Sequence, residues 1–112
     1  MTPLSEEEQE TFLDAQSAIY PKIGSELIAL TPESWKSAVL KLAEDPGGVK
    51  HSIYSEDGRR EVVAPSMELF EHTGELERLF RKYGRMWTVA YFRIKQSEGG
   101  QWRFNVNYEY PA

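Results

Sequence analysis

Two histidines and two pairs of adjacent carboxylates are the side chains of this 112-residue chain best suited to acid–base or metal chemistry. His51 and His72 do not share the His-Glu-x-x-His spacing that presents two metal ligands on one helix face. Glu44–Asp45 and Glu56–Asp57 offer general acid and base groups, but both pairs lie in turn-forming stretches where solvation explains them better. The sequence therefore predicts no metal, no cofactor and no catalytic residues.

Motifs for nucleophilic or nucleotide-binding sites are also missing. The chain has no cysteine, which removes thiol catalysis and zinc sites built on thiolates. It has no Gly-x-Ser-x-Gly elbow, and its glycines occur at turns rather than in a phosphate-binding or dinucleotide fingerprint. The sequence thus supports neither a catalytic triad nor a phosphate-binding loop.

Aromatic residues are concentrated in the last third of the chain. On neighbouring strands they suggest either a buried core or a stacking platform for single-stranded nucleic acid. A platform needs a basic surround, whereas 18 acidic and 13 basic side chains give a net charge of −5. Core packing is thus the favoured interpretation, and direct binding of nucleic acid is not expected. The residues concerned are Trp87, Tyr91, Phe92, Trp102, Phe104, Tyr108 and Tyr110.

The negative charge is uneven along the chain. Residues 1–56 hold ten acidic and four basic side chains, a balance of −6, and residues 57–112 hold eight and nine, a balance of +1. Such a field favours a basic partner, although glutamates near a helix start also serve helix stability and solubility.

Length and composition predict a single domain over residues 1–112. The 40% hydrophobic content suits a packed core, and there is neither a signal-like start nor an apolar run long enough for a membrane span. A cytoplasmic protein with no membrane contact is expected. A capping box at Ser5 and Glu8 opens a helix to about Ala29, in which Pro21 indicates either a kink or two abutting helices.

The secondary structure of the middle of the chain is harder to predict. Trp35, Val39 and Leu42 have helical spacing, yet Ala38, Leu40 and Leu42 alternate as in a strand. A turn at 45–48 precedes a strand over 49–55, and Glu56–Gly58 reads as a hairpin turn before a short strand over 60–64. A helix follows from Ser66, or from Thr73, to about Tyr83, and strands over 86–96 and 101–110 flank a turn at 97–100.

Several of these segments together resemble the YezG-like family of bacterial immunity proteins. Ala18–Ile28 reads AIYPKIGSELI, Thr31–Trp35 reads TPESW, and an aromatic hairpin runs from Trp87 to Tyr110. The family is similar in its Ile-Tyr-x-x-Ile helix, its Pro-Glu-x-Trp approach to the first strand, a Gly-rich turn, and its final helix and hairpin. The resemblance implies that Thr31–Trp35 is a turn leading into a strand.

The expected fold is α+β: an N-terminal helical segment, a four- to five-stranded antiparallel sheet, and one helix inserted before a C-terminal hairpin, with both helical regions on one sheet face. The resemblance implies a non-enzymatic antitoxin that binds and neutralises the toxin domain, often a nuclease, delivered by a neighbouring bacterium. An acidic protein suits the basic cleft of such a partner. The residues expected to bind the toxin are Glu44, Asp45, Tyr54, Glu56, Asp57, Glu68 and Glu71.

The alternative is a small-ligand-binding or hydrolytic enzyme with a pocket between helix and sheet. Its signature would be His51 or His72 beside a carboxylate in a concave, mostly apolar site. A subunit that only stabilises a larger assembly is a third, weaker interpretation.

Overall fold

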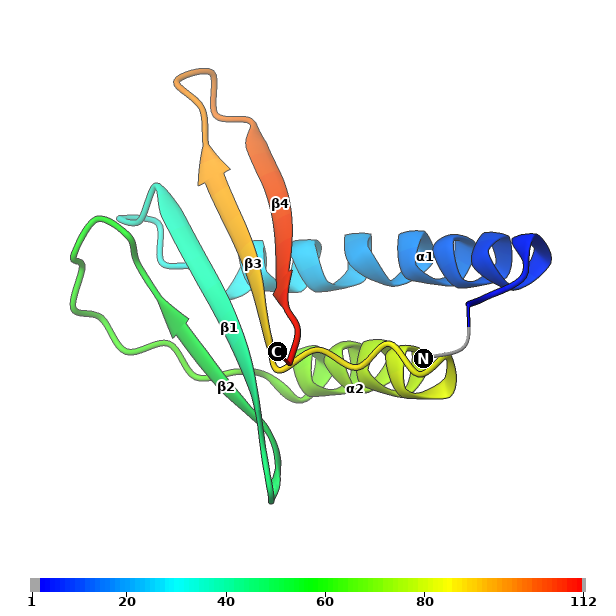
Figure 1. Ribbon diagram of the computed structural model, residues 1–112. Coiled ribbons are helices and arrows are strands. Elements are labelled where there is room, and N and C mark those ends of the chain that lie inside the picture. Colours follow the sequence, from blue (N-terminus) through cyan, green and yellow to red (C-terminus); the bar gives the residue numbers. More distant parts are fainter. Residues whose placement is uncertain (1–2, 112) are drawn as a thin grey trace.

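The computed structural model describes residues 3–111 and has the α+β architecture that the sequence predicts (Figure 1). Its four strands form one antiparallel sheet in the order β2-β1-β3-β4. The elements are α1 (Glu6–Leu30), β1 (Ser37–Asp45), β2 (Gly48–Tyr54), α2 (Met67–Lys82), β3 (Val89–Gln96) and β4 (Trp102–Glu109).

Helix α1 begins at the predicted capping box and is one continuous helix. The Ser5 side chain accepts from the Glu8 backbone N–H, and the Glu8 carboxylate accepts from the Ser5 backbone N–H, each at 3.1 Å. Pro21 lies inside the helix, and both it and Ser17, whose carbonyl loses its helical partner, are exposed. Because that carbonyl is on the water side of the helix, the proline does not divide α1 into two helices.

The ambiguous segment after α1 is a short turn followed by the long strand β1, as the resemblance implied. Strand β1 pairs with β2 on one side and β3 on the other. Residues on both of its faces are buried near its start: Val39, beside Tyr54 and Arg93 in the register, is as inaccessible as Ala38 and Leu40. The turn at 45–48 is confirmed, with Gly48 at φ +133°, a backbone conformation that favours glycine.

A turn forms at Glu56 and Asp57, followed by Gly58 at φ +74°, but it joins no hairpin, and the predicted strand at 60–64 is wrong. Residues 55–66 form an irregular connection from the end of β2 to α2, without ladder pairing. Glu61 holds this connection against the start of β1, because its carboxylate accepts from Ser34 Oγ at 3.1 Å and from Trp35 Nε1 at 2.9 Å. Val62 is left 96% exposed, and β2 remains an edge strand.

Helix α2 begins after Ser66, whose hydroxyl accepts from the Leu69 N–H at 3.0 Å, and not at Thr73. Three side chains of its apolar stripe, Leu69, Leu76 and Phe80, are fully buried. The predicted end is confirmed, since Tyr83 caps the helix and Gly84 follows with φ +66°.

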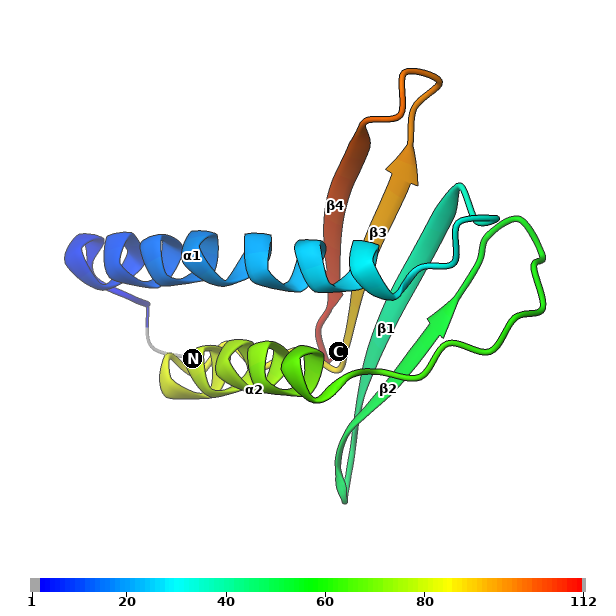
Figure 2. The ribbon, with the colours of Figure 1, turned by 180° about the vertical axis from the view of Figure 1, so that it is seen from behind.

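Both helices cover the same face of the sheet, as Figures 1 and 2 show from opposite sides. The core lies between them: Ile23 and Leu27 of α1 and Phe80 of α2 meet Leu40 and Phe92 of the central strands. The aromatic residues of β4 face this layer but are less buried than the sequence predicts. Phe104 is 38% exposed because β4 is an edge strand, and Tyr110, just beyond the end of β4, is 51% exposed.

Candidate functional site

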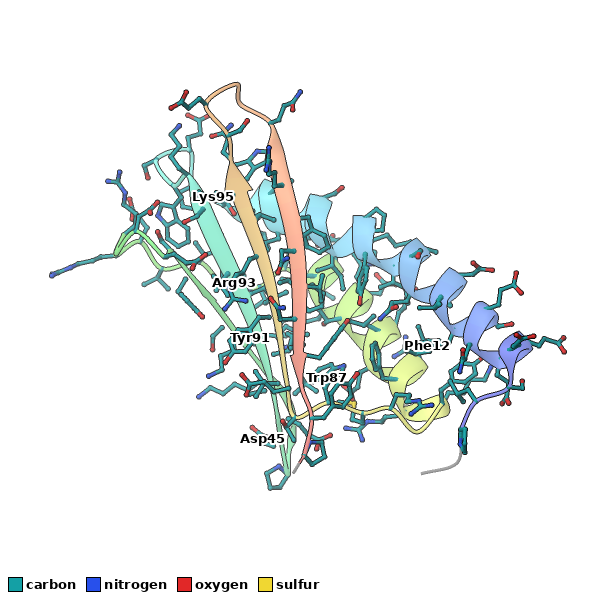
Figure 3. All side chains as sticks on the ribbon, turned by 45° about the horizontal axis from the view of Figure 1, so that its top comes forward. Phe12, Asp45, Trp87, Tyr91, Arg93 and Lys95 are labelled. Atoms are coloured by element: carbon teal, nitrogen blue, oxygen red, sulfur yellow. The ribbon has the colours of Figure 1, made fainter. Side chains whose placement is uncertain are left out.

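The face of the sheet turned away from the helices carries a concentration of positive charge. We call it the outer face; alternate residues of every strand point to it, as strand geometry requires. In Figure 3, Tyr91, Arg93 and Lys95 follow one another along β3 on this face. Its basic residues come from all four strands and are Lys41, Lys50, Arg93, Lys95 and Arg103.

Tyr91 lies at the centre of the outer face between two cations. Arg93 Cζ is 4.9 Å and Lys41 Nζ is 5.9 Å from the centroid of its ring, distances at which the ring quadrupole attracts a cation. Arg93 also donates from Nη1 to Asn107 Oδ1 at 3.1 Å. These contacts hold the Arg93 guanidinium against the sheet while leaving most of its donors unused.

A second surface lies at the start of α2, where apolar and acidic side chains alternate. Met67 is 85% and Phe70 49% exposed, and Glu68 and Glu71 on the same turns are exposed as well. We call these four residues the α2-start patch. Within residues 3–111 neither glutamate forms an ion pair. The patch therefore combines unpaired negative charge with apolar area that a partner can bury.

His51 joins this patch to the sheet. Its Nε2 is 2.7 Å from Thr73 Oγ1, and its ring centroid is 4.5 Å from that of Phe70. Burial lowers the pKa of His51, an effect opposed by the hydrogen bond with the Val49 carbonyl and by the charge of Glu77. His51 thus fixes the first turns of α2 on strand β2.

The seven residues expected to bind a toxin lie in three places and do not form one surface. Glu68 and Glu71 belong to the α2-start patch. Glu44 and Asp45 lie at the β1–β2 turn, where the Glu44 carboxylate accepts from Arg81 Nη2 at 2.9 Å. The other three, Tyr54, Glu56 and Asp57, lie at the opposite end of β2, about 20 Å away by strand geometry.

Sequence reasoning missed the apolar members of the α2-start patch and the outer-face cations. Met67 and Phe70 are three positions apart and fall outside the buried stripe of α2, a signal that a helical projection contains. In β3 and β4, Arg93, Lys95 and Arg103 alternate with residues of the helix-facing side. The periodicity was visible, but only the sheet order shows that these positions share a face with Lys41 and Lys50.

The enzyme interpretation required a histidine beside a carboxylate in a pocket. His72 Nδ1 is 3.6 Å from Glu75 Oε1, and Lys22 Nζ is 3.6 Å from the other oxygen of the same carboxylate. A hollow of about 430 Å³ does lie where the end of α1 meets the sheet, with Trp35 and Trp102 in its lining, but neither histidine reaches it. This alternative stays a prediction.

Residues 3–111 contain neither a metal-binding cluster nor a membrane-spanning helix. No group of three or more histidine, aspartate or glutamate side chains is placed to hold a metal ion. Neither helix of this part of the chain has the length and apolar character needed to cross a bilayer.

No model of a known protein family matches this chain, and no curated protein sequence matches it either. The fold and the surfaces described above therefore define an α+β domain of four strands and two helices, and the YezG-like resemblance remains an expectation from sequence.

Proposed function

We propose that this protein is an immunity protein: it binds the toxin domain of a competing bacterium in the cytoplasm and neutralises it without catalysing a reaction. The toxin is proposed to be a nuclease with a basic surface. A toxin is proposed as the partner because the chain resembles the YezG-like family in Ala18–Ile28, Thr31–Trp35 and the C-terminal hairpin. The α2-start patch supplies the physical support.

The observation that carries the proposal is the exposure of Met67 and Phe70 between two unpaired carboxylates. Burial of a large apolar side chain contributes roughly 1.5–3 kcal/mol, so two such residues suit the centre of an interface. Glu68 and Glu71 would border that centre and face the cations of a nuclease. Charged residues at the rim speed association, while the apolar centre slows release.

The position of the patch also suits recognition. Ser66 caps the helix, and the His51–Thr73 contact ties its second turn to β2. Because the backbone of these turns is already ordered, binding costs the conformational entropy of the side chains but little backbone entropy. The patch is thus a preorganised surface rather than a mobile loop.

The test is co-expression with the toxin domain encoded beside the gene for this chain, followed by growth measurement, copurification and binding kinetics. The proposal predicts rescue of growth and a one-to-one complex. Met67→Ala with Phe70→Ala should weaken the complex by about thirtyfold or more, mainly through faster release. Glu68→Lys with Glu71→Lys should weaken it by about tenfold at low salt, mainly through slower association.

A matched control reverses the same amount of charge elsewhere. Glu10→Lys with Asp14→Lys alters two exposed acidic residues of α1, away from the α2 start. If this control weakens the complex as much as the patch variants do, the α2-start patch is not the interface. If the folded protein neither binds nor protects against the toxin, the immunity proposal itself is wrong.

A further inference from the structure

The cations of the outer face form a diagonal line across the sheet. The register sets Lys50 beside Ala43, and Lys41 lies two positions further along β1. Lys41 is paired in turn with Tyr91, and Arg93 lies two positions further along β3. From one cation to the next, the position thus shifts by one strand across the sheet and by two residues along it, so the Cα atoms of successive cations are about 8 Å apart.

The same shift leads from β3 to the last strand, β4. Arg93 is paired with Asn105, and Arg103 lies two positions away along β4. Lys50, Lys41, Arg93 and Arg103, one from each strand, form what we call the cation diagonal. Lys95 stands directly opposite Arg103 in the register and doubles the charge at this end.

This arrangement does not stabilise the fold. Two like charges directly across a ladder, as at Lys95 and Arg103, are destabilising. None of the five cations forms an ion pair within residues 3–111, where the pairs instead involve Lys22, His72 and Arg81. Positive charge that is aligned and left unneutralised is the feature that a polyanion recognises.

Acidic residues occupy the two corners of the outer face that the diagonal avoids, and a further one, Asp45, lies at the β1–β2 turn beyond the Lys50 end of the diagonal. Asp57 lies beside the start of β1, where Ser37 Oγ donates to its carboxylate at 3.4 Å. Glu109 lies at the other corner, opposite Val89 in the register and three strands from Lys50. An anionic chain is therefore attracted along the diagonal and repelled from its flanks.

We propose that the outer face binds single-stranded nucleic acid, with successive phosphates along the cation diagonal. The Arg93 guanidinium and the Tyr91 ring provide a planar surface for a base, and Asn105 and Asn107 beside them offer amide donors and acceptors. An acidic protein is the less suitable occupant. Protein interfaces are depleted in lysine and have an apolar centre, whereas three of these five cations are lysines around a central Tyr91.

The net charge of −5 does not oppose this proposal, although it argued against nucleic acid when only the sequence was considered. The acidic residues of both helices lie on the far side of the sheet from the diagonal. At physiological ionic strength, charge beyond about 8 Å is largely screened. A strand on the outer face therefore experiences mainly the local cations.

The experiment titrates the whole chain into a fluorescein-labelled oligouridylate RNA of twelve nucleotides and measures fluorescence anisotropy at several salt concentrations. Binding should weaken with salt with a log–log slope of about −3, as expected for four to five phosphate contacts on a single strand. Lys95→Gln with Arg103→Gln should weaken binding about tenfold at low salt and reduce the slope by about 1.4.

The matched control removes two cations outside the outer face. Arg78→Gln with Lys82→Gln changes the net charge equally on α2 and should alter affinity less than twofold. Thermal unfolding of all variants checks that they remain folded.

Three results would overturn the proposal. One is no binding by the wild-type chain at low salt, and another is an equal loss of affinity in the α2 control. The third is equally tight binding of a polyglutamate peptide of the same charge, which would identify the occupant as an acidic protein. No toxin is present in this experiment, so its outcome is independent of the immunity proposal.

Discussion

The two faces of the sheet are built from alternate residues of the same four strands, yet they differ in almost every property. Ala90, Phe92 and Ile94 on the helix-facing side of β3 are at most 1% exposed, whereas Tyr91 and Arg93 between them face solvent in part. The helix-facing side carries the apolar burial that stabilises the fold. Apart from the buried Ser37 and Val39 near the start of β1, the outer face contributes little to that burial and is free to carry charge.

The helix layer differs from the outer face in the sign and pairing of its charges. Its cations Lys22 and Arg81 form ion pairs with Glu75, Glu77 and Glu44, whereas Arg78 and Lys82 of α2, like the outer-face cations, have no carboxylate partner within residues 3–111. Paired surface charge is typical of a solvated helix, and unpaired aligned charge is typical of a binding surface. The two sides of the domain therefore differ mainly in the sign of their charge, with the excess of glutamates in the helices and the aligned cations on the outer face.

The largest expected effect on stability comes from a comparison of two truncations on β3, one on each face of the sheet. Phe92→Ala removes a fully buried ring that contacts Tyr20, Phe104 and Tyr108 and should lower the free energy of unfolding by about 3–5 kcal/mol. Tyr91→Ala on the same strand should cost less than half as much. Urea denaturation measures both, and equal losses would show that the outer face is part of the core.

A smaller effect is expected at the hydroxyl pair between α1 and β4. Tyr20 Oη and Tyr108 Oη are 2.6 Å apart, and burial, then the hydrogen bond to Tyr20, raises the pKa of Tyr108 far above its ordinary value. Tyr108→Phe should cost about 1 kcal/mol of unfolding free energy. Adding Tyr20→Phe should cost little more, because the same hydrogen bond is already lost; additive losses in a double-mutant cycle would contradict this.

The contact of α2 with β2 should depend on pH through His51. Burial holds the pKa of this imidazole below its ordinary value of 6.5, so the unfolded state binds the proton more readily. Its contribution to stability should be complete above about pH 6.5 and should fall as the pH drops through the lower folded-state pKa. The free energies of unfolding of the wild type and of His51→Gln should differ by a constant amount above that pH, and below it the wild type should lose more stability than the variant. Denaturation at several pH values measures both, and an unchanged pH dependence in the variant would exclude His51 as the cause.

The smallest effect is expected where Glu61 holds the connection before α2. Hydrogen bonds from Trp35, from its own backbone and from Ser34 lower the pKa of this exposed carboxyl below its ordinary value of 4.5. Its modest stabilisation should be present above about pH 4.5 and disappear as the pH falls through the folded-state pKa. Protection of residues 55–66 against hydrogen exchange, corrected for the intrinsic exchange rate at each pH, should decrease over that range, and Glu61→Gln should remove the pH dependence without unfolding the sheet.

The local signals in the sequence were enough for most elements. The capping box at Ser5, the cap at Ser66 and the strict alternation from Trp102 to Tyr108 depend on neighbouring residues only, so helix starts and the final hairpin were predictable. The wrong prediction of a strand at 60–64 shows where local sequence signals are insufficient. Valines at 62 and 63 favour a strand, but the bonds of Glu61 to Ser34 and Trp35 hold that segment away from the ladder.

For the candidate sites, the sequence determined which residues are charged and tertiary structure decided which of them meet. Glu68 and Glu71 were predicted as contacts, but their apolar neighbours Met67 and Phe70 became visible only once the buried stripe of α2 was fixed by packing. The cation diagonal depends on strand order and register, which place Lys41 and Lys50 beside Arg93 and Arg103 across long stretches of chain. A net charge is a sum over residues, whereas a binding surface depends on their positions, and positions are fixed only by pairing and burial over the whole domain.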